Sequence, residues 1–157
     1  MQKVVIVAGC ESYRTGDFLA AASLLRVDAI VATDTAAPLE GSVGHVEIDL
    51  SDPMTAAVVV AEAAPDANAV IAVDDGGVAV AAAAASRLGL GHNRPEAVAL
   101  TRDKLAMRRA LDRSDVSQPL FAAAAPGQVA DVAGSIGFPV VIKPVGLSAS
   151  RGVIRAD

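Results

Sequence analysis

Short apolar runs rich in valine and isoleucine alternate with helical stretches through the first half of the chain, and this alternation constrains the fold more than any other feature. The runs are continuous rather than interrupted at every second residue, as in strands that are buried on both faces. Strands that alternate with helices form parallel sheets. We therefore expect an α/β fold with an open, Rossmann-like parallel sheet and helices on both faces. The expected strands are 3–7, 28–32, 45–50 and 69–73, and the expected helices are 15–25, 53–64 and 78–88.

The clearest helix start in the sequence lies at Ser51-Asp52-Pro53. A serine or aspartate side chain can accept a hydrogen bond from a free backbone N–H of the first helical turn. Proline fits that turn because its missing N–H would have no partner there. The pattern predicts a capped helix that begins at Pro53.

The pattern changes near Asn93-Arg94-Pro95, where a second region begins. We place a domain boundary there, with an α/β domain in residues 1–94 and part of an α+β subdomain in residues 95–157. Thr101 is the expected cap of the longer helix in the second region. The expected elements are helices 96–100, 101–113 and 128–136, strands 120–124, 140–143 and 153–155, and a loop over 144–152.

Charge and composition exclude several classes of partner. The net charge is −5 and the pI is near 4.9, so no overall basic field attracts nucleic acid or anionic lipid, and an anionic ligand needs a local site. No run of ~20 apolar residues that could span a membrane is present. Cys10 is the only cysteine, which excludes an intrachain disulfide and favours a reducing, cytoplasmic setting.

A glycine-bounded loop follows the strand expected at 140–143. Residues 146–152 read Gly-Leu-Ser-Ala-Ser-Arg-Gly. Such a loop can offer backbone N–H groups and hydroxyls to phosphate oxygens, and Arg151 adds a positive charge. The Gly-Lys-Ser/Thr ending of a Walker A loop is missing. Taken alone, the loop is more simply interpreted as an ordinary hairpin connection.

Two of the three lysines are candidates for contacts with an anion. Lys143 ends an apolar strand, where its ammonium group must reach water or meet an anion. Lys104 lies in the first turn of a helix, where the positive end of the helix dipole mildly disfavours a cation. Because the chain has ten arginines and only three lysines, a lysine at both places suits sites that need a compact ammonium group. On local grounds alone, either residue could instead be a solvated surface lysine.

Asp74 and Asp75 follow the fourth expected strand and precede two glycines and a helix. In open α/β sheets, ligands bind at the carboxyl ends of the strands. An aspartate at the start of a helix can equally serve as its cap. Substrate contact and capping are therefore both open for this pair. No His, Cys and carboxylate residues have the spacing of a metal site.

Taken together, these motifs resemble the ATP-grasp superfamily over essentially the whole chain. The closest similarity is to its carboxylate–amine ligases of the phosphoribosylglycinamide-synthetase and amino-acid-ligase type. The segments that carry the resemblance are 73–77 (Val-Asp-Asp-Gly-Gly), 88–96 (Leu-Gly-Leu-Gly-His-Asn-Arg-Pro-Glu), 103–111 (Asp-Lys-Leu-Ala-Met-Arg-Arg-Ala-Leu), 138–144 (Phe-Pro-Val-Val-Ile-Lys-Pro) and 146–153 (Gly-Leu-Ser-Ala-Ser-Arg-Gly-Val).

The resemblance implies that ATP and a carboxylate form an acyl phosphate, from which an amine then displaces phosphate. It implies that Lys104 and Lys143 contact the nucleotide, and that a flexible loop closes over the triphosphate. The matching loop residues are Ser148, Ala149, Ser150, Arg151 and Gly152. Asp74 and Asp75 would contribute to the pocket for the small-molecule substrates. The implied cofactors are ATP and Mg²⁺, with the metal ligands expected beyond residue 157.

The resemblance also implies a division of the chain. Residues 1–94 correspond to the preATP-grasp domain, and residues 95–157 to a helical linker and part of the small lid subdomain of the ATP-grasp domain. We expect an N-terminal fragment of a ligase, inactive on its own and without catalytic residues. A homodimer is a candidate assembly, because an unpaired strand edge can attract a neighbour.

Other classes of protein fit the sequence less well. A dinucleotide-binding domain would need a Gly-x-Gly-x-x-Gly turn after the first strand, and residues 9–16 lack it. Asp34 alone would suit a ribose. A phosphoacceptor receiver domain would need an acidic pair at the same place. A non-catalytic module that binds a nucleotide or another small ligand remains open as the alternative.

Overall fold

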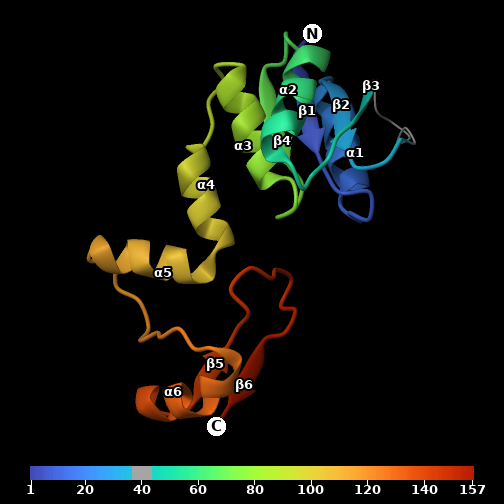
Figure 1. Cartoon of the computed structure of the whole chain (residues 1–157). Coiled ribbons are helices and arrows are strands. Elements are labelled where there is room, and N and C mark those ends of the chain that lie inside the picture. Colours follow the sequence, from blue (N-terminus) through green and yellow to red (C-terminus); the bar gives the residue numbers. More distant parts are fainter. Residues whose placement is uncertain (37–43) are drawn as a thin grey trace. The chain divides into compact units, whose positions relative to one another are not determined.

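A computed structural model describes residues 1–36 and 44–157 of the chain. It consists of two compact units, Met1–Val98 and Ala99–Asp157, whose elements are labelled in Figure 1. The domain boundary after residue 94 and the assignment of each part to a named domain stay predictions. No helix in the described residues is long and apolar enough to cross a bilayer.

The first unit is built on a four-stranded parallel sheet with the strand order β3-β2-β1-β4. This arrangement confirms the expected fold class. The strands are β1 (Lys3–Val7), β2 (Asp28–Thr33), β3 (Gly44–Glu47) and β4 (Ala69–Ala72), and the helices are α1 (Thr15–Leu25), α2 (Pro53–Ala63) and α3 (Val78–Arg87). The third strand is shorter than the expected 45–50, because Asp49 turns the chain by accepting hydrogen bonds from Ser51.

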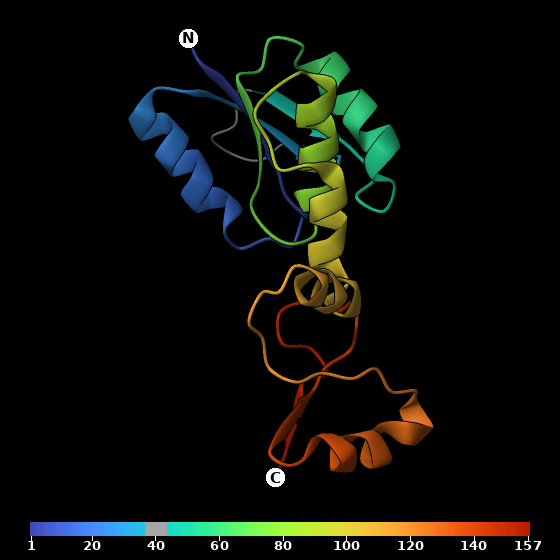
Figure 2. The ribbon, with the colours of Figure 1, turned by 90° about the vertical axis from the view of Figure 1, so that its left-hand side faces the viewer.

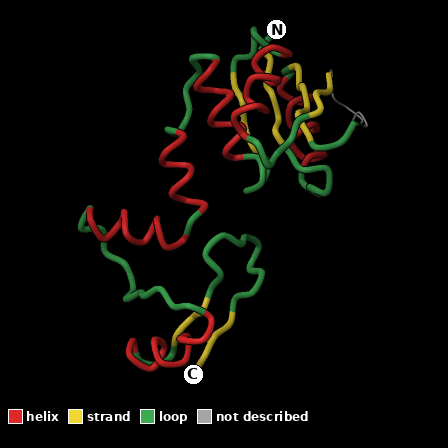
Figure 3. Tube along the Cα trace, viewed as in Figure 1, coloured by secondary structure: helices red, strands yellow, loops and turns green. Residues whose placement is uncertain are grey.

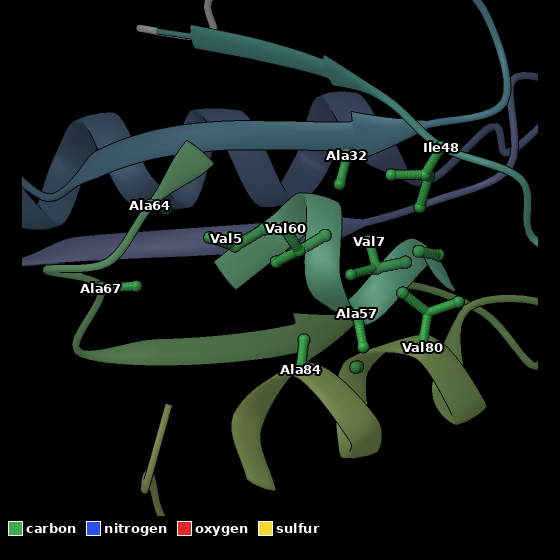
Figure 4. Close-up of a cluster of buried hydrophobic side chains, with 12 residues drawn as sticks. Val5, Val7, Ala32, Ile48, Ala57, Val60, Ala64, Ala67, Val80 and Ala84 are labelled. Atoms are coloured by element: carbon green, nitrogen blue, oxygen red, sulfur yellow. The ribbon is translucent and has the colours of Figure 1, made fainter. Parts of the chain in front are cut away.

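Successive residues of β1 point to opposite faces of the sheet, as the pleat of a strand requires. Val5 and Val7 belong to the apolar cluster on the face covered by α2 and α3, which Figure 4 shows at close range. Ile6 belongs to the cluster on the other face, which contains Leu19 of α1. Figure 2 shows α1 on one side of the sheet and the other two helices on the opposite side. Both faces of the sheet are therefore covered.

Most of the buried side chains on α2 and α3 are alanine. The buried side chains are Ala56, Ala57 and Val60 on α2, and Val80, Ala81, Ala82, Ala84 and Ala85 on α3. Side chains this small let two helix backbones come close, and larger ones hold them apart. The alanine-rich composition thus produces a thin layer above the sheet rather than a core of large rings.

Helix α2 begins where the sequence predicts it. The carboxylate of Asp52 accepts hydrogen bonds from the backbone N–H of Thr55 at 3.2 Å and from its hydroxyl at 2.7 Å. Pro53 occupies the first turn. The hydrogen bonds from Thr55 hold the pKa of Asp52 below its usual value. The capped start at Pro53 is confirmed.

The second unit contains a short antiparallel hairpin in which β5 pairs with β6. The hairpin has the expected strands, with Ile142 opposite Ile154. The elements from residue 95 onward are α4 (Pro95–Arg102), α5 (Lys104–Arg113), the 3₁₀ helix η1 (Pro126–Gln128), α6 (Val129–Ile136), β5 (Val140–Ile142) and β6 (Ile154–Ala156).

Two expectations for the second region are wrong. Residues 120–124 are not a strand but part of the irregular connection between α5 and α6, which Figure 3 draws as loop. A strand needs a neighbour for its ladder of hydrogen bonds, and among the residues that the structure describes β5 pairs only with β6. The connection is instead tied to α5 by Gln118, whose side-chain amide donates to the Arg108 carbonyl at 2.9 Å.

The second error concerns the cap of the helix that carries Lys104. Thr101 lies inside α4, and Asp103 is the cap of α5. The Asp103 carboxylate accepts a hydrogen bond from the backbone N–H of Ala106 at 2.8 Å. Aspartate outranks threonine as a cap, so the single long helix expected at 101–113 divides at Asp103. Lys104 becomes the first residue of α5.

Candidate functional site

The strand order of the first unit creates a place for a ligand beside the carboxyl ends of β1 and β4. The chain passes from β1 outward to β2 and β3, then returns to place β4 on the other side of β1. The connections after β1 and β4 therefore leave the sheet toward opposite faces. In open α/β sheets, such a reversal of strand order marks the crevice that receives ligands.

Asp74 and Asp75 lie at this reversal, directly after β4. One carboxylate oxygen of Asp74 accepts a hydrogen bond from the backbone N–H of Gly76 at 3.0 Å, which closes a local turn. The cap residue of α3 is Gly77 rather than Asp74 or Asp75. The capping interpretation of the aspartate pair is therefore wrong for this helix. Asp74 is half-buried and Asp75 is exposed.

Gly77 brings the turn after β4 against the end of β1. A Cβ atom added at Gly77 would lie 2.9 Å from the carbonyl oxygen of Val7 and 2.9 Å from its Cγ1 atom. The same carbonyl accepts the backbone N–H of Val73 at 3.0 Å. Only a residue without a side chain fits this approach. The glycine fixes how closely Asp74 and Asp75 follow the sheet edge.

Asp34 joins the ends of β1 and β2 at the same edge of the sheet. Its carboxylate accepts the backbone N–H of Cys10 at 2.6 Å and the hydroxyl of Thr33 at 3.3 Å. The Cys10 N–H holds the pKa of Asp34 below its usual value. From the sequence, Asp34 is a candidate only for contact with a ribose, and nothing in the sequence indicates that Cys10 is its partner. The position of Asp34 directly after a strand does indicate that it lies at the edge of the sheet.

Asp34 also acts on the thiol of Cys10. The thiol's side-chain hydrogen bond with the Asp34 carboxylate is the largest cause that raises the pKa of the thiol, and desolvation adds to it. A thiol with a raised pKa forms less thiolate at neutral pH, and the thiolate is the reactive form. The exposed Cys10 is therefore expected to react slowly with alkylating agents.

We expect Asp34→Asn to accelerate alkylation of Cys10 by iodoacetamide by roughly twofold or more at pH 7.5, because the thiol pKa falls when the neighbouring charge is removed. The gain should shrink as the pH rises above the thiol pKa in both proteins. Mass spectrometry follows the reaction at this single cysteine. The control is Glu62→Gln, which removes an exposed carboxylate of α2. Equal rates for Asp34→Asn and the unchanged chain would contradict the assigned cause.

In the second unit, Lys104 is bound to the loop that follows Lys143. The Lys104 ammonium donates hydrogen bonds to the carbonyl oxygens of Val145, at 3.4 Å, and Leu147. The backbone N–H of Lys104 also donates to the Val145 carbonyl, at 3.2 Å. The two segments are 41 and 43 residues apart along the chain. The structure thus brings the start of α5 and the glycine–serine loop together.

Lys143 has the opposite surroundings. It follows the last residue of β5 and is exposed. Within residues 1–36 and 44–157 it makes no hydrogen bond or ion pair. Its ammonium group is therefore available to a ligand, two residues before the carbonyl that Lys104 holds.

The loop itself has an unusual backbone. Ala149 and Ser150 have φ angles of 53° and 57°, and Gly152 has a φ of 68°. This left-handed region favours glycine, and only one of the three residues is a glycine. The backbone N–H and Nε of Arg151 both donate to the Ser148 carbonyl, at 3.2 and 3.3 Å. The tip of the loop is therefore a compact turn, and Arg151 lies folded back on it.

Comparisons with known proteins support the fold and leave the chemistry of the site to inference. No protein family and no curated protein matches the sequence. Solved structures do match. L-amino acid ligase from Bacillus licheniformis is 21% identical with a TM-score of 0.74, and the match covers 100% of this chain and 39% of that one.

Two further structures match at lower identity. Phosphoribosylglycinamide synthetase from Anaerococcus prevotii is 18% identical with a TM-score of 0.65, over 99% of this chain and 38% of that one. N5-carboxyaminoimidazole synthetase from Staphylococcus aureus, solved with ADP, is 14% identical with a TM-score of 0.68, over 98% and 41%. The chain thus spans about two fifths of the length of the enzymes that it resembles.

Proposed function

We propose that this chain, which has the fold of part of the ATP-grasp carboxylate–amine ligases, supplies nucleotide contacts and part of a substrate site to an ATP-dependent ligase. The reaction would activate a small carboxylate as an acyl phosphate, which an amine then attacks. By itself the chain would bind without catalysing.

The proposal rests on the hydrogen bonds between Lys104 and the loop that follows Lys143. A polyphosphate carries several negative charges close together, and ammonium groups with backbone N–H donors are the usual protein contacts for it. Lys143 offers a free ammonium group directly before this loop. Lys104 lies within reach of the loop backbone. Lys143 and the carbonyls that Lys104 contacts therefore belong to the same stretch of chain, residues 143–147.

The second part of the proposal concerns the sheet edge of the first unit. Asp74 and Asp75 would contact the small-molecule substrates at the reversal of strand order. Their carboxylates suit donors such as amine or hydroxyl groups rather than a substrate carboxylate. Gly77 and Asp34 would position the two connections that border this edge.

Magnesium has no recognisable site in the part of the chain that the structure describes. No group of three His, Cys, Asp or Glu side chains that could hold a metal ion lies in residues 1–36 and 44–157. The residues present do not fit a bound Mg²⁺. No step of the proposal goes through the metal.

The test is a calorimetric titration of the full natural chain with ATP. Lys143→Met should weaken ATP binding by about tenfold, since a hydrogen bond to a charged group contributes about 1.5 kcal/mol or more. Lys3→Met is the matched control, because the Lys3 ammonium is paired with Asp66 at 2.7 Å. Equal affinities of Lys143→Met and the unchanged chain would refute the assigned role of Lys143. Absence of binding by the unchanged chain would refute the nucleotide site altogether.

A further inference from the structure

We propose that Lys104 is a latch that holds the loop of residues 144–152 while no nucleotide is bound, and that nucleotide phosphates release the loop by competing for the same ammonium group. The release step rests on the proposed function. The latch itself rests only on the contacts of Lys104.

Three hydrogen bonds join Lys104 to the loop. Two come from its ammonium group, to the carbonyls of Val145 and Leu147, and one from its backbone N–H to Val145. The backbone donor is fixed because Asp103 caps α5 and thereby orients its first turn. The side-chain donor is mobile, since the ammonium group of a lysine lies at the end of a flexible four-carbon chain. The ammonium group can thus leave the loop while the helix start stays in place.

The neck of the loop forms a second fixed point. A Cβ atom added at Gly152 would lie 2.8 Å from the Cγ atom of Pro144. The two ends of the loop therefore touch at a glycine. The segment between them can swing as one body, because its tip is closed by the turn of Ser148 and Arg151.

The chemistry of the partners explains the direction of the exchange. Carbonyl oxygens are neutral acceptors, whereas phosphate oxygens carry a negative charge that attracts the ammonium group in addition to accepting its hydrogen bonds. A phosphate near Lys104 would therefore replace the carbonyls of Val145 and Leu147 as the hydrogen-bond acceptor of the ammonium group. Left-handed backbone at Ala149 and Ser150 costs on the order of 1–2 kcal/mol per residue. Because both residues lie within the closed tip, this cost is the same whether the loop is held or released.

The first experiment tests the latch without nucleotide, by amide hydrogen exchange and by cleavage with an arginine-specific protease in the full natural chain. Lys104→Met keeps most of the length of the side chain and removes its hydrogen-bond donors. We expect about tenfold faster exchange at the residue 104 amide and faster cleavage after Arg151. Arg109→Met, which removes an exposed cation from the same helix, should behave as the unchanged chain. Equal exchange and cleavage in Lys104→Met and the unchanged chain would overturn the latch.

The second experiment adds saturating ATP to the unchanged chain. Exchange at the residue 104 amide should rise toward the rate of Lys104→Met, because Val145 leaves this N–H. ATP binding that leaves this rate unchanged would overturn the release step. Absence of ATP binding would overturn the release step together with the proposed function, whereas faster exchange in Lys104→Met without nucleotide would still establish the latch. The two failures are therefore distinguishable.

Discussion

Ile6→Ala is expected to lower the free energy of unfolding of the Met1–Val98 unit by about 3 kcal/mol. Ile6 is only 1% exposed and is the largest of the fully buried side chains. Its cluster includes Leu19 and Val31, and the other buried members are mostly alanine. Alanine side chains cannot extend into the space that the removed atoms leave, so a cavity remains and adds to the lost burial.

Urea unfolding of the Ile6→Ala variant, monitored through the hydrogen exchange of the β1 and β2 amides, would measure the loss in free energy of unfolding of this unit alone. The control is Ile6→Val, which removes one methylene group and should cost about 1 kcal/mol. A loss for Ile6→Ala no larger than that for Ile6→Val would mean that the helix α1 side of the sheet is loosely packed.

Gly77→Ala should lower the free energy of unfolding of the same unit by about 2 kcal/mol, because overpacking a filled site forces backbone shifts. The new Cβ atom would meet the carbonyl oxygen of Val7 at 2.9 Å. Val7 is fully buried in the central strand and cannot retreat. The turn after β4 and the start of α3 would have to move outward, and Asp74 with them.

Gly16→Ala is the matched control for Gly77→Ala. Gly16 lies on the exposed side of α1, where an added Cβ atom would meet nothing within 4 Å. Alanine should stabilise that helix by up to about 1 kcal/mol. Denaturation midpoints of both variants, measured by the exchange of β1 amides, give the comparison. A stable Gly77→Ala variant would show that the turn does not press on Val7.

Much of the first unit follows from sequence pattern, because its signals are local. The continuous apolar runs mark strands buried on both faces, and β1 and β4 fall where they indicate. Asp52 and Pro53 mark the start of α2 for a reason contained in two residues. The order of the strands is not local, and nothing in the run at 69–72 says that β4 pairs with β1 rather than with β3.

The errors in the second unit have the same origin. Residues 120–124 resemble a strand in composition, but a strand exists only if another strand offers its backbone groups. Thr101 and Asp103 are both acceptable caps, and the structure uses the aspartate. The resemblance predicts that Lys104 and the 146–152 loop act on the same nucleotide, but the sequence does not predict that they bond to each other directly. Their hydrogen bonds cross 41 residues of chain, and they involve backbone carbonyls that no side-chain pattern reveals.

The alanine-rich contact between α2 and α3 has a thermodynamic consequence. A buried leucine or isoleucine gives up about 0.5–1 kcal/mol of rotamer entropy, whereas alanine has no rotamers to lose. Ala57 and Ala84 therefore contribute little hydrophobic free energy, but fixing their side chains also costs little conformational entropy. The side chains of this interface therefore add little to the conformational entropy that the folding of this unit must overcome.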